Sequence, residues 1–158
     1  MKKFNLKLLF ICIIIPLATG ALAGFITKNS TEVFNFVNKP PLSPPAILFP
    51  IVWTVLYILM GISLYFVLNS FADNDQKKAA IKIFALQLAF NFVWPLLFFG
   101  LELYLVSFVW LLILIVLIIL MIKQFAGSSK LAAYLQIPYL VWVVFAGYLN
   151  LMIFLLNM

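Results

Sequence analysis

Residues 103–122 read LYLVSFVWLLILIVLIILMI, an uninterrupted apolar run without a charged side chain. About 20 helical residues are enough to cross the ~30 Å hydrocarbon core of a bilayer. The run is apolar on every side and shows no alternation, so it predicts a helix rather than a strand of a transmembrane barrel. This stretch alone therefore indicates a membrane protein built from helices.

Four further stretches have the same character and extend this prediction to the whole chain. The composition agrees, because 67% of the 158 residues are hydrophobic and only 9% are charged, whereas soluble domains carry about 25% charged residues. We expect one domain, residues 1–158, that folds as an all-α bundle of five transmembrane helices with a first loop at 27–46. The predicted spans are 8–26, 47–69, 79–99, 103–122 and 131–156.

The lysines predict how this bundle is oriented. Only Lys28 and Lys39 fall on one side of the five predicted spans. The other side holds Lys2, Lys3, Lys7, Lys77, Lys78, Lys82, Lys123 and Lys130. Since positively charged flanks stay in the cytoplasm, we expect a multi-pass protein of the cell membrane with its N-terminus in the cytoplasm and its C-terminus outside.

The first span allows two interpretations. A basic N-terminus, the apolar run 8–17 and the Ala-Leu-Ala sequence at 21–23 resemble a cleaved signal peptide. The apolar run continues to Ile26, however, which favours a retained span. Within this span, Gly20 and Gly24 form a small-residue pair that lets helices approach closely. The pair marks either a dimer face or packing against the chain's own helices.

The composition also excludes several kinds of chemistry. The chain has no His and no Arg, and Cys12 is its single cysteine. A His/Cys metal site, a Ser-His-Asp or Cys-His catalytic set and an internal disulfide are therefore excluded. No ionisable residue lies near the middle of a span, which argues against ion-coupled transport. The net charge of +6 comes from lysines at span ends, so we expect no nucleic acid partner. Because the chain lacks a set of His and Cys ligands, we also expect no metal, and we expect no other cofactor.

Aromatic and amide side chains recur at helical spacing inside three of the spans. Residues three or four positions apart share one face of a helix. If the three faces converge, they enclose an aromatic-walled cavity with a few amide groups, which suits a flat hydrophobic ligand. The alternative is that the aromatics are core packing and the asparagines join helices. The faces consist of Trp53, Tyr57 and Gly61; of Asn91, Trp94 and Phe98; and of Pro138, Trp142, Ala146 and Asn150.

A proline-rich segment precedes the second span. It reads KPPLSPP over 39–45, and its four prolines fix φ and remove backbone donors. The segment is either a rigid start for the helix or the rim of a cavity that opens to the outside. Lysines at this rim could attract the acidic groups of a ligand.

Three segments resemble, in order, the signatures of the tryptophan-rich sensory protein family, which includes the mitochondrial translocator protein, once called the peripheral benzodiazepine receptor. They read PPLSPP at 40–45 with FPIVWTVLYILMG at 49–61, QLAFNFVW at 87–94 before Phe98 and Phe99, and PYLVWVVFAGYLN at 138–150. The resemblance covers about residues 8–155 and favours a retained first span.

The resemblance implies a five-helix bundle that forms a homodimer in membrane lipid. It also implies binding of porphyrins, other tetrapyrroles and benzodiazepine-site ligands in one pocket under loop one. Trp53 and Trp142 match the tryptophans that the family links to light-dependent porphyrin breakdown, and Ala146 matches an alanine that affects ligand and sterol binding. The implied ligand-binding residues are Pro44, Pro45, Trp53, Tyr57, Asn91, Trp94, Phe98, Trp142, Ala146 and Asn150.

The chain departs from the family pattern in three respects. Leu42 and Ile47 stand where several members have Trp, so the rim has fewer aromatic side chains. The absence of His leaves iron without an imidazole ligand, which favours metal-free porphyrin over haem. The sterol motif of the animal members is missing, so sterol binding is not expected.

Four functions are compatible with these features. The first is a receptor or sensor for tetrapyrroles such as protoporphyrin IX. The second is an enzyme that degrades protoporphyrin in light, with Trp53 or Trp142 as electron partner. The third is a transporter of tetrapyrroles or lipids, and the fourth is a structural subunit with Gly20 and Gly24 on its contact face. The aromatic faces and the proline-rich rim favour the receptor or sensor.

Overall fold

The computed structural model describes residues 3–28 and 37–158 of the chain. This part of the chain is helical and contains no strand. The helices are α1 (Leu6–Thr27), α2 (Leu48–Leu68), α3 (Asn74–Pro95), α4 (Tyr104–Ser128), α5 (Lys130–Leu135) and α6 (Ile137–Leu156), and a π-helical turn, η2 (Leu96–Gly100), continues α3.

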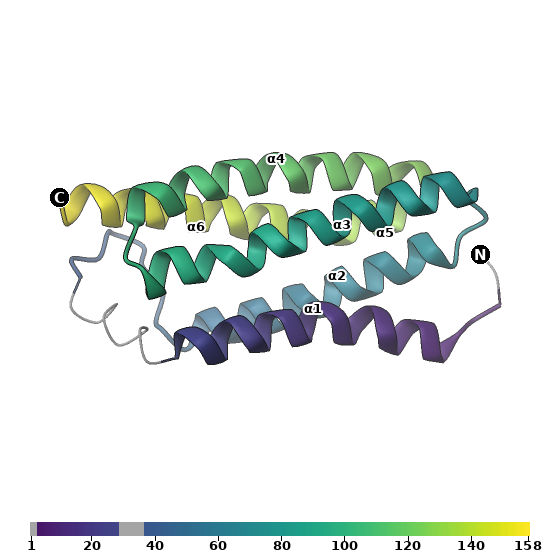
Figure 1. Ribbon diagram of the computed structural model, residues 1–158, viewed down its shortest axis with the longest axis horizontal. Coiled ribbons are helices and arrows are strands. Elements are labelled where there is room, and N and C mark those ends of the chain that lie inside the picture. Colours follow the sequence, from purple (N-terminus) through teal and green to yellow (C-terminus); the bar gives the residue numbers. More distant parts are fainter. Residues whose placement is uncertain (1–2, 29–36) are drawn as a thin grey trace.

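Five helical segments among the described residues are long and apolar enough to cross a membrane. The third consists of α3 with η2, and the fifth of α5 with α6. Successive segments run in opposite directions, so the first described residues and the C-terminus lie at opposite ends of the bundle (Figure 1). The predicted fold class, an all-α bundle of five transmembrane helices, is confirmed. Of the predicted first loop, 27–46, residues 29–36 lie outside the described part.

Polar caps and prolines determine where the helices begin and end, and these positions differ from the limits of the apolar runs. Helix α3 begins at Asn74, ahead of its apolar run, because the Asp73 carboxylate accepts a hydrogen bond from the Gln76 N–H at 2.7 Å. The last span is broken between α5 and α6 at Gln136. Pro138, in the first turn of α6, has no backbone N–H to continue the preceding helix.

Most of the fully buried side chains belong to α2 to α6, and α1 packs on one side of these helices. Side chains of α4 and α6 such as Leu111, Ile118 and Val143 are fully buried. Helix α1 is the least buried of the five spans, and it packs mainly against α2. A helix that covers a bundle from one side leaves room for a cavity beneath it.

Two glycines show how α1 meets α2. A Cβ atom at Gly61 would overlap the backbone of Cys12 and Ile13, so the two helices approach closely there. A Cβ at Gly20 would overlap the ring of Tyr57, whereas a Cβ at Gly24 would meet nothing within 4 Å. Gly20 therefore serves packing within the chain, one of the two roles that the sequence allowed for the Gly20 and Gly24 pair.

Candidate ligand-binding cavity

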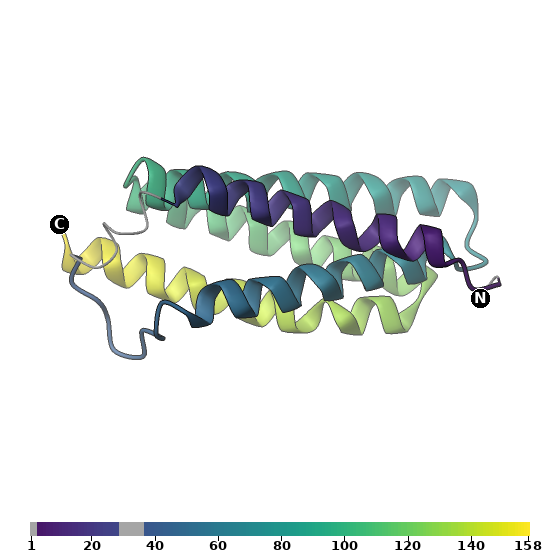
Figure 2. The same cartoon turned by 90° about the horizontal axis from the view of Figure 1, so that it is seen from below.

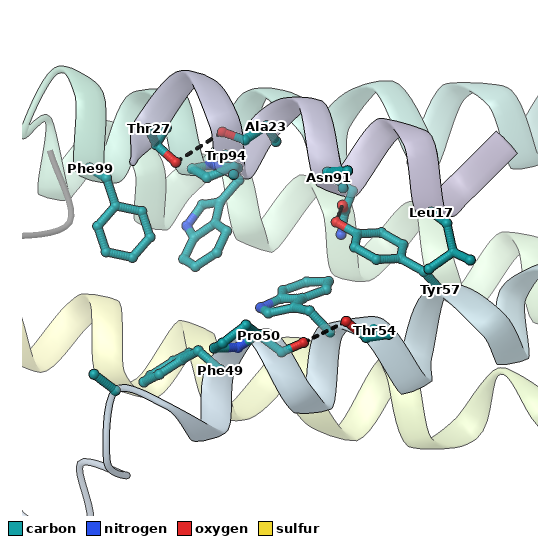
Figure 3. Close-up of a pocket in the computed structure, with 16 residues that line it drawn as sticks. Leu17, Ala23, Thr27, Phe49, Pro50, Thr54, Tyr57, Asn91, Trp94 and Phe99 are labelled. Atoms are coloured by element: carbon teal, nitrogen blue, oxygen red, sulfur yellow. Dashed lines mark hydrogen bonds between the residues drawn. The ribbon is translucent and has the colours of Figure 1, made fainter. Parts of the chain in front are cut away.

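A cavity of about 620 Å³ lies between α1, α2 and α3, near the end of the bundle that holds the C-terminus (Figure 3). We call this end the C-terminal end of the bundle. The volume falls within the range of roughly 300–1,000 Å³ that is typical of small-molecule sites. The lining residues are Leu17, Gly20, Ala21, Ala23, Gly24, Thr27, Ala46, Phe49, Pro50, Trp53, Thr54, Tyr57, Asn91, Trp94, Pro95 and Phe99.

Aromatic rings from two helices form the walls of this cavity. The rings of Trp53 and Trp94 face each other from α2 and α3 with their centroids 6.2 Å apart. Trp53 stacks on Tyr57 at 5.5 Å, one helical turn along α2. Figure 3 shows Trp94 and Phe99 on one side of the cavity, Phe49 on the other, and Tyr57 next to Asn91 at one end. Flat apolar faces of this kind favour contact with a flat apolar ligand.

A chain of buried hydrogen bonds fixes the deep end of the cavity. The Tyr57 hydroxyl donates to Asn91 Oδ1 at 2.7 Å. The Asn91 amide donates in turn to the Tyr139 hydroxyl at 3.0 Å, and that hydroxyl donates to Gln87 Oε1 at 2.9 Å. Each hydroxyl proton thereby has a defined acceptor, so the network links α2, α3 and α6 and orients the Tyr57 ring in the cavity wall.

A second polar group holds Trp94. Its indole N–H donates to Asn150 Oδ1 at 3.1 Å, and the Ser107 hydroxyl donates to the same oxygen at 2.9 Å. The Asn150 amide donates to the Tyr104 carbonyl at 2.7 Å. Asn150 thus lies behind Trp94 and fixes its ring from α6.

The described surface of the cavity offers few free hydroxyl protons. Among residues 3–28 and 37–158, no Lys, Asp or Glu lines it. The hydroxyls of Thr27 and Thr54 donate to carbonyls of their own helices, Ala23 O at 2.9 Å and Pro50 O at 2.7 Å. A neutral, largely apolar group is therefore the part of a ligand that suits this space.

Four of the ten residues predicted as ligand-binding line this cavity, namely Trp53, Tyr57, Asn91 and Trp94. Phe98 is buried and stacks on Trp94 of the lining, Ala146 is buried in the core, and Asn150 acts through Trp94. Trp142 contacts Phe49 of the lining with ring centroids 5.9 Å apart, and its indole N–H is buried without a hydrogen-bond partner among the described residues. Pro44 and Pro45 precede Ala46, the first lining residue of the α2 side.

Residue spacing within the spans did not indicate the contribution of α1 or of the bracing residues. Leu17, Ala21 and their neighbours are small or aliphatic and have no distinctive chemistry; the Gly20 and Gly24 pair was their only signal. Gln87 lies within a quoted segment, but its role depends on Tyr139, which belongs to a different span. Contacts between spans cannot be derived from spacing within one span.

The segment 37–46 is attached to the C-terminal end of α6. The Asn38 backbone N–H donates to Asn157 Oδ1 at 2.9 Å, and the Asn157 amide donates back to the Asn38 carbonyl at 3.1 Å. The Tyr148 hydroxyl donates to the Pro41 carbonyl at 3.2 Å. These bonds hold the proline-rich segment at the C-terminal end of the bundle, beside the cavity.

Comparisons with known proteins agree with this architecture. Residues 12–156 match the model of the TspO/MBR family. The chain is 39% identical to the tryptophan-rich protein TspO of Chlorobaculum tepidum, over 94% of this chain and 95% of the relative. It is 40% identical to the tryptophan-rich protein TspO of Archaeoglobus fulgidus, over 97% and 99% of the two chains. It is also 32% identical to the translocator protein of Bos taurus, over 82% and 80%.

Proposed function

Because this chain belongs to the TspO/MBR family of membrane proteins, we propose that it is a receptor or sensor that binds tetrapyrroles such as protoporphyrin IX. The proposed site is the cavity between α1, α2 and α3, and neutral hydrophobic ligands of the benzodiazepine-site type share it. The protein works in the cell membrane, with the N-terminus in the cytoplasm, as a homodimer.

The facing indoles of Trp53 and Trp94 carry this proposal. A tetrapyrrole is a flat ring with a large apolar surface, and burial stabilises it by about 25 cal/mol per Å² before the costs of ordering. The two indoles and the Tyr57 ring supply flat surfaces on which such a ring can stack. The described lining residues carry no charge, which suits the ring itself.

The acidic side groups of a porphyrin belong at the C-terminal end of the bundle. Lys28 follows Thr27 of the lining, and Lys39 lies in the segment that is attached to α6. We propose that the propionates stay at this end, near the two lysines, while the ring occupies the cavity. This arrangement avoids burying a carboxylate in an apolar space.

A titration with protoporphyrin IX in the dark tests the proposal. We expect saturable quenching of tryptophan fluorescence and a shift of the Soret band, both with micromolar affinity. A Trp53→Ala variant should bind at least about tenfold more weakly, because a wall of the cavity is lost. The matched control is Trp110→Ala, since Trp110 stacks on Phe90 at 4.2 Å and does not line the cavity. Quenching no stronger than that of free tryptophan would contradict the proposal.

Light-dependent degradation of the bound porphyrin is a second candidate. The observation in its favour is that Trp53 contacts three other electron-rich rings, those of Tyr57, Trp94 and Tyr139, with centroids 5.5 to 6.2 Å away. Such a cluster can supply an electron to an excited porphyrin in the presence of oxygen. Illumination of the titrated sample tests it: a Trp53→Phe, Trp142→Phe double variant that loses its Soret band at the wild-type rate would reject this role.

A further inference from the structure

We propose that the ligand reaches the cavity sideways from the hydrocarbon layer of the membrane, through an opening between α1 and α2. This inference rests on the proposed function for the identity of the ligand. It concerns the route by which an apolar molecule enters, and it makes the membrane, rather than the aqueous phase, the immediate source of that molecule.

The first observation is the way in which α1 and α2 separate. Their backbones approach closely at Gly61, where an added Cβ would overlap Cys12 and Ile13. Further toward the C-terminal end, the Tyr57 ring occupies the space beside Gly20, and an added Cβ at Gly24 meets no neighbouring side chain or helix within 4 Å. Figure 2 shows the two helices well apart at this end of the bundle.

The second observation is that some lining residues are also on the outer surface. Ala21 and Gly24 of α1 line the cavity and are exposed. The same is true of Pro50 and Thr54 of α2. A residue that faces both a cavity and the exterior lies on the rim of an opening. These four residues come from the two helices that separate, so the rim lies between α1 and α2.

The third observation is the depth of this rim. At 1.5 Å per residue, Ala21 lies about 9 Å from the end of α1 at Thr27, and Thr54 lies about 9 Å from the start of α2 at Leu48. The hydrocarbon core is ~30 Å thick, so a point this far from a helix end faces acyl chains rather than water. The neighbouring exposed side chains are apolar, including Leu22, Phe25, Ile51 and Val55. The rim therefore opens toward lipid.

The alternative route, along the bundle axis, is partly covered. The segment 37–46 crosses the C-terminal end and is held there by the reciprocal hydrogen bonds between Asn38 and Asn157. These bonds limit the movement of the segment on that side of the bundle. An apolar ligand that partitions into the bilayer also meets the lateral opening at a much higher local concentration.

A Gly24→Leu variant tests the route, because a Cβ added there meets nothing within 4 Å. We expect association of protoporphyrin IX in lipid nanodiscs to slow by about fivefold or more, because the leucine narrows the passage. Gly24 also lines the cavity, so the association rate, and not Kd, is the measure of the route. The control is Gly127→Leu, which makes the same change at an exposed site on α4, again with no atom within 4 Å.

The possible outcomes distinguish a wrong route of entry from a wrong ligand. Unchanged rates in Gly24→Leu, with normal binding by wild type, would overturn the lateral route and leave the proposed function intact. If the association and dissociation rates of protoporphyrin IX instead rise in Asn157→Ala and stay constant in Gly24→Leu, the ligand enters past the segment 37–46. The inference is then wrong. A raised Kd with an unchanged association rate would also overturn it, because the leucine would then only occupy ligand volume.

A second measurement needs no tetrapyrrole. In a chain whose other three tryptophans are replaced by Phe, lipids brominated on the upper acyl chain should quench Trp53, because lipid has access through the opening. Gly24→Leu should reduce this quenching by about half or more, and Gly127→Leu should not change it. Absence of quenching in wild type would refute an opening to lipid even if protoporphyrin does not bind at all.

Discussion

Asn91 connects three helices through one side chain. Its oxygen accepts from Tyr57 and its amide donates to Tyr139, so neither hydroxyl is left without a partner in a buried environment. Hydrogen bonds between membrane helices contribute roughly 0.6–2 kcal/mol each. The residue therefore stabilises the bundle as well as shaping the cavity wall.

We predict that Asn91→Leu lowers the free energy of unfolding by about 1–3 kcal/mol, because it removes two hydrogen bonds and leaves the buried Tyr57 hydroxyl without its acceptor. Tyr57→Phe, which removes only one of these bonds, should cost less. Thermal unfolding in detergent, followed by circular dichroism, measures both. Equal stability of Asn91→Leu and wild type would show that the network does not hold the helices together.

At the scale of single residues, the sequence correctly indicated which side chains are distinctive but not what they touch. Trp53, Tyr57, Asn91 and Trp94 line the cavity as their spacing on two helices suggested. Spacing fixes the direction of a side chain around its own helix, but the predicted face of the fifth span contributes no residue to the described lining. Spacing contains no information about the neighbouring helix, so Tyr139 was missed as the partner of Asn91.

The helices themselves show what an apolar run does and does not define. The runs located all five spans, because crossing the hydrocarbon layer requires apolar side chains. They did not define the helix ends, because a cap such as Asp73 extends a helix into polar sequence. The break at Gln136 also lies inside the predicted span 131–156, where composition stays apolar and only Pro138 signals a change.

The contact between α1 and α2 depends on the missing side chain of Gly61. We predict that Gly61→Ala lowers the free energy of unfolding by about 1–3 kcal/mol, because the new Cβ can be accommodated only if the backbone of α1 moves away. The buried Cys12 thiol should then react faster with a maleimide than in wild type.

Gly127→Ala is the matched control for this experiment, since its Cβ meets nothing within 4 Å. It should leave the Cys12 reaction rate unchanged and have a neutral or slightly stabilising effect, as alanine favours helix over glycine by up to about 1 kcal/mol. Identical maleimide rates in Gly61→Ala and wild type would mean that α1 tolerates the added atom without moving.

The two ends of the molecule differ in positive charge. This difference predicts the orientation of the protein in the membrane. Lysines gather at the end of the bundle that holds the start of α1 and the loop between α2 and α3. The cavity and the segment 37–46 lie at the other end. With the basic end in the cytoplasm, the cavity lies toward the outer leaflet.

Single cysteines placed in a Cys12→Ala chain test this orientation in intact cells. We predict that Ser43→Cys reacts with a membrane-impermeant maleimide from outside. Asp75→Cys should react only after the cells are permeabilised, because it lies in the first turn of α3, at the end of the bundle expected in the cytoplasm. Labelling in the reverse order would mean that the lysine asymmetry does not decide the topology of this chain.

The hydrogen bonds that hold the cavity wall in place determine when, during synthesis, the cavity reaches its final shape. Every described residue that lines the cavity lies at or before Phe99, so a growing chain already contains the complete wall when its third span has entered the membrane. Asn91 and Trp94, however, find their partners only in Tyr139 and Asn150. Because synthesis proceeds from the N-terminus, the site is complete in composition long before it acquires its final shape, and α6, the last helix to arrive, sets that shape.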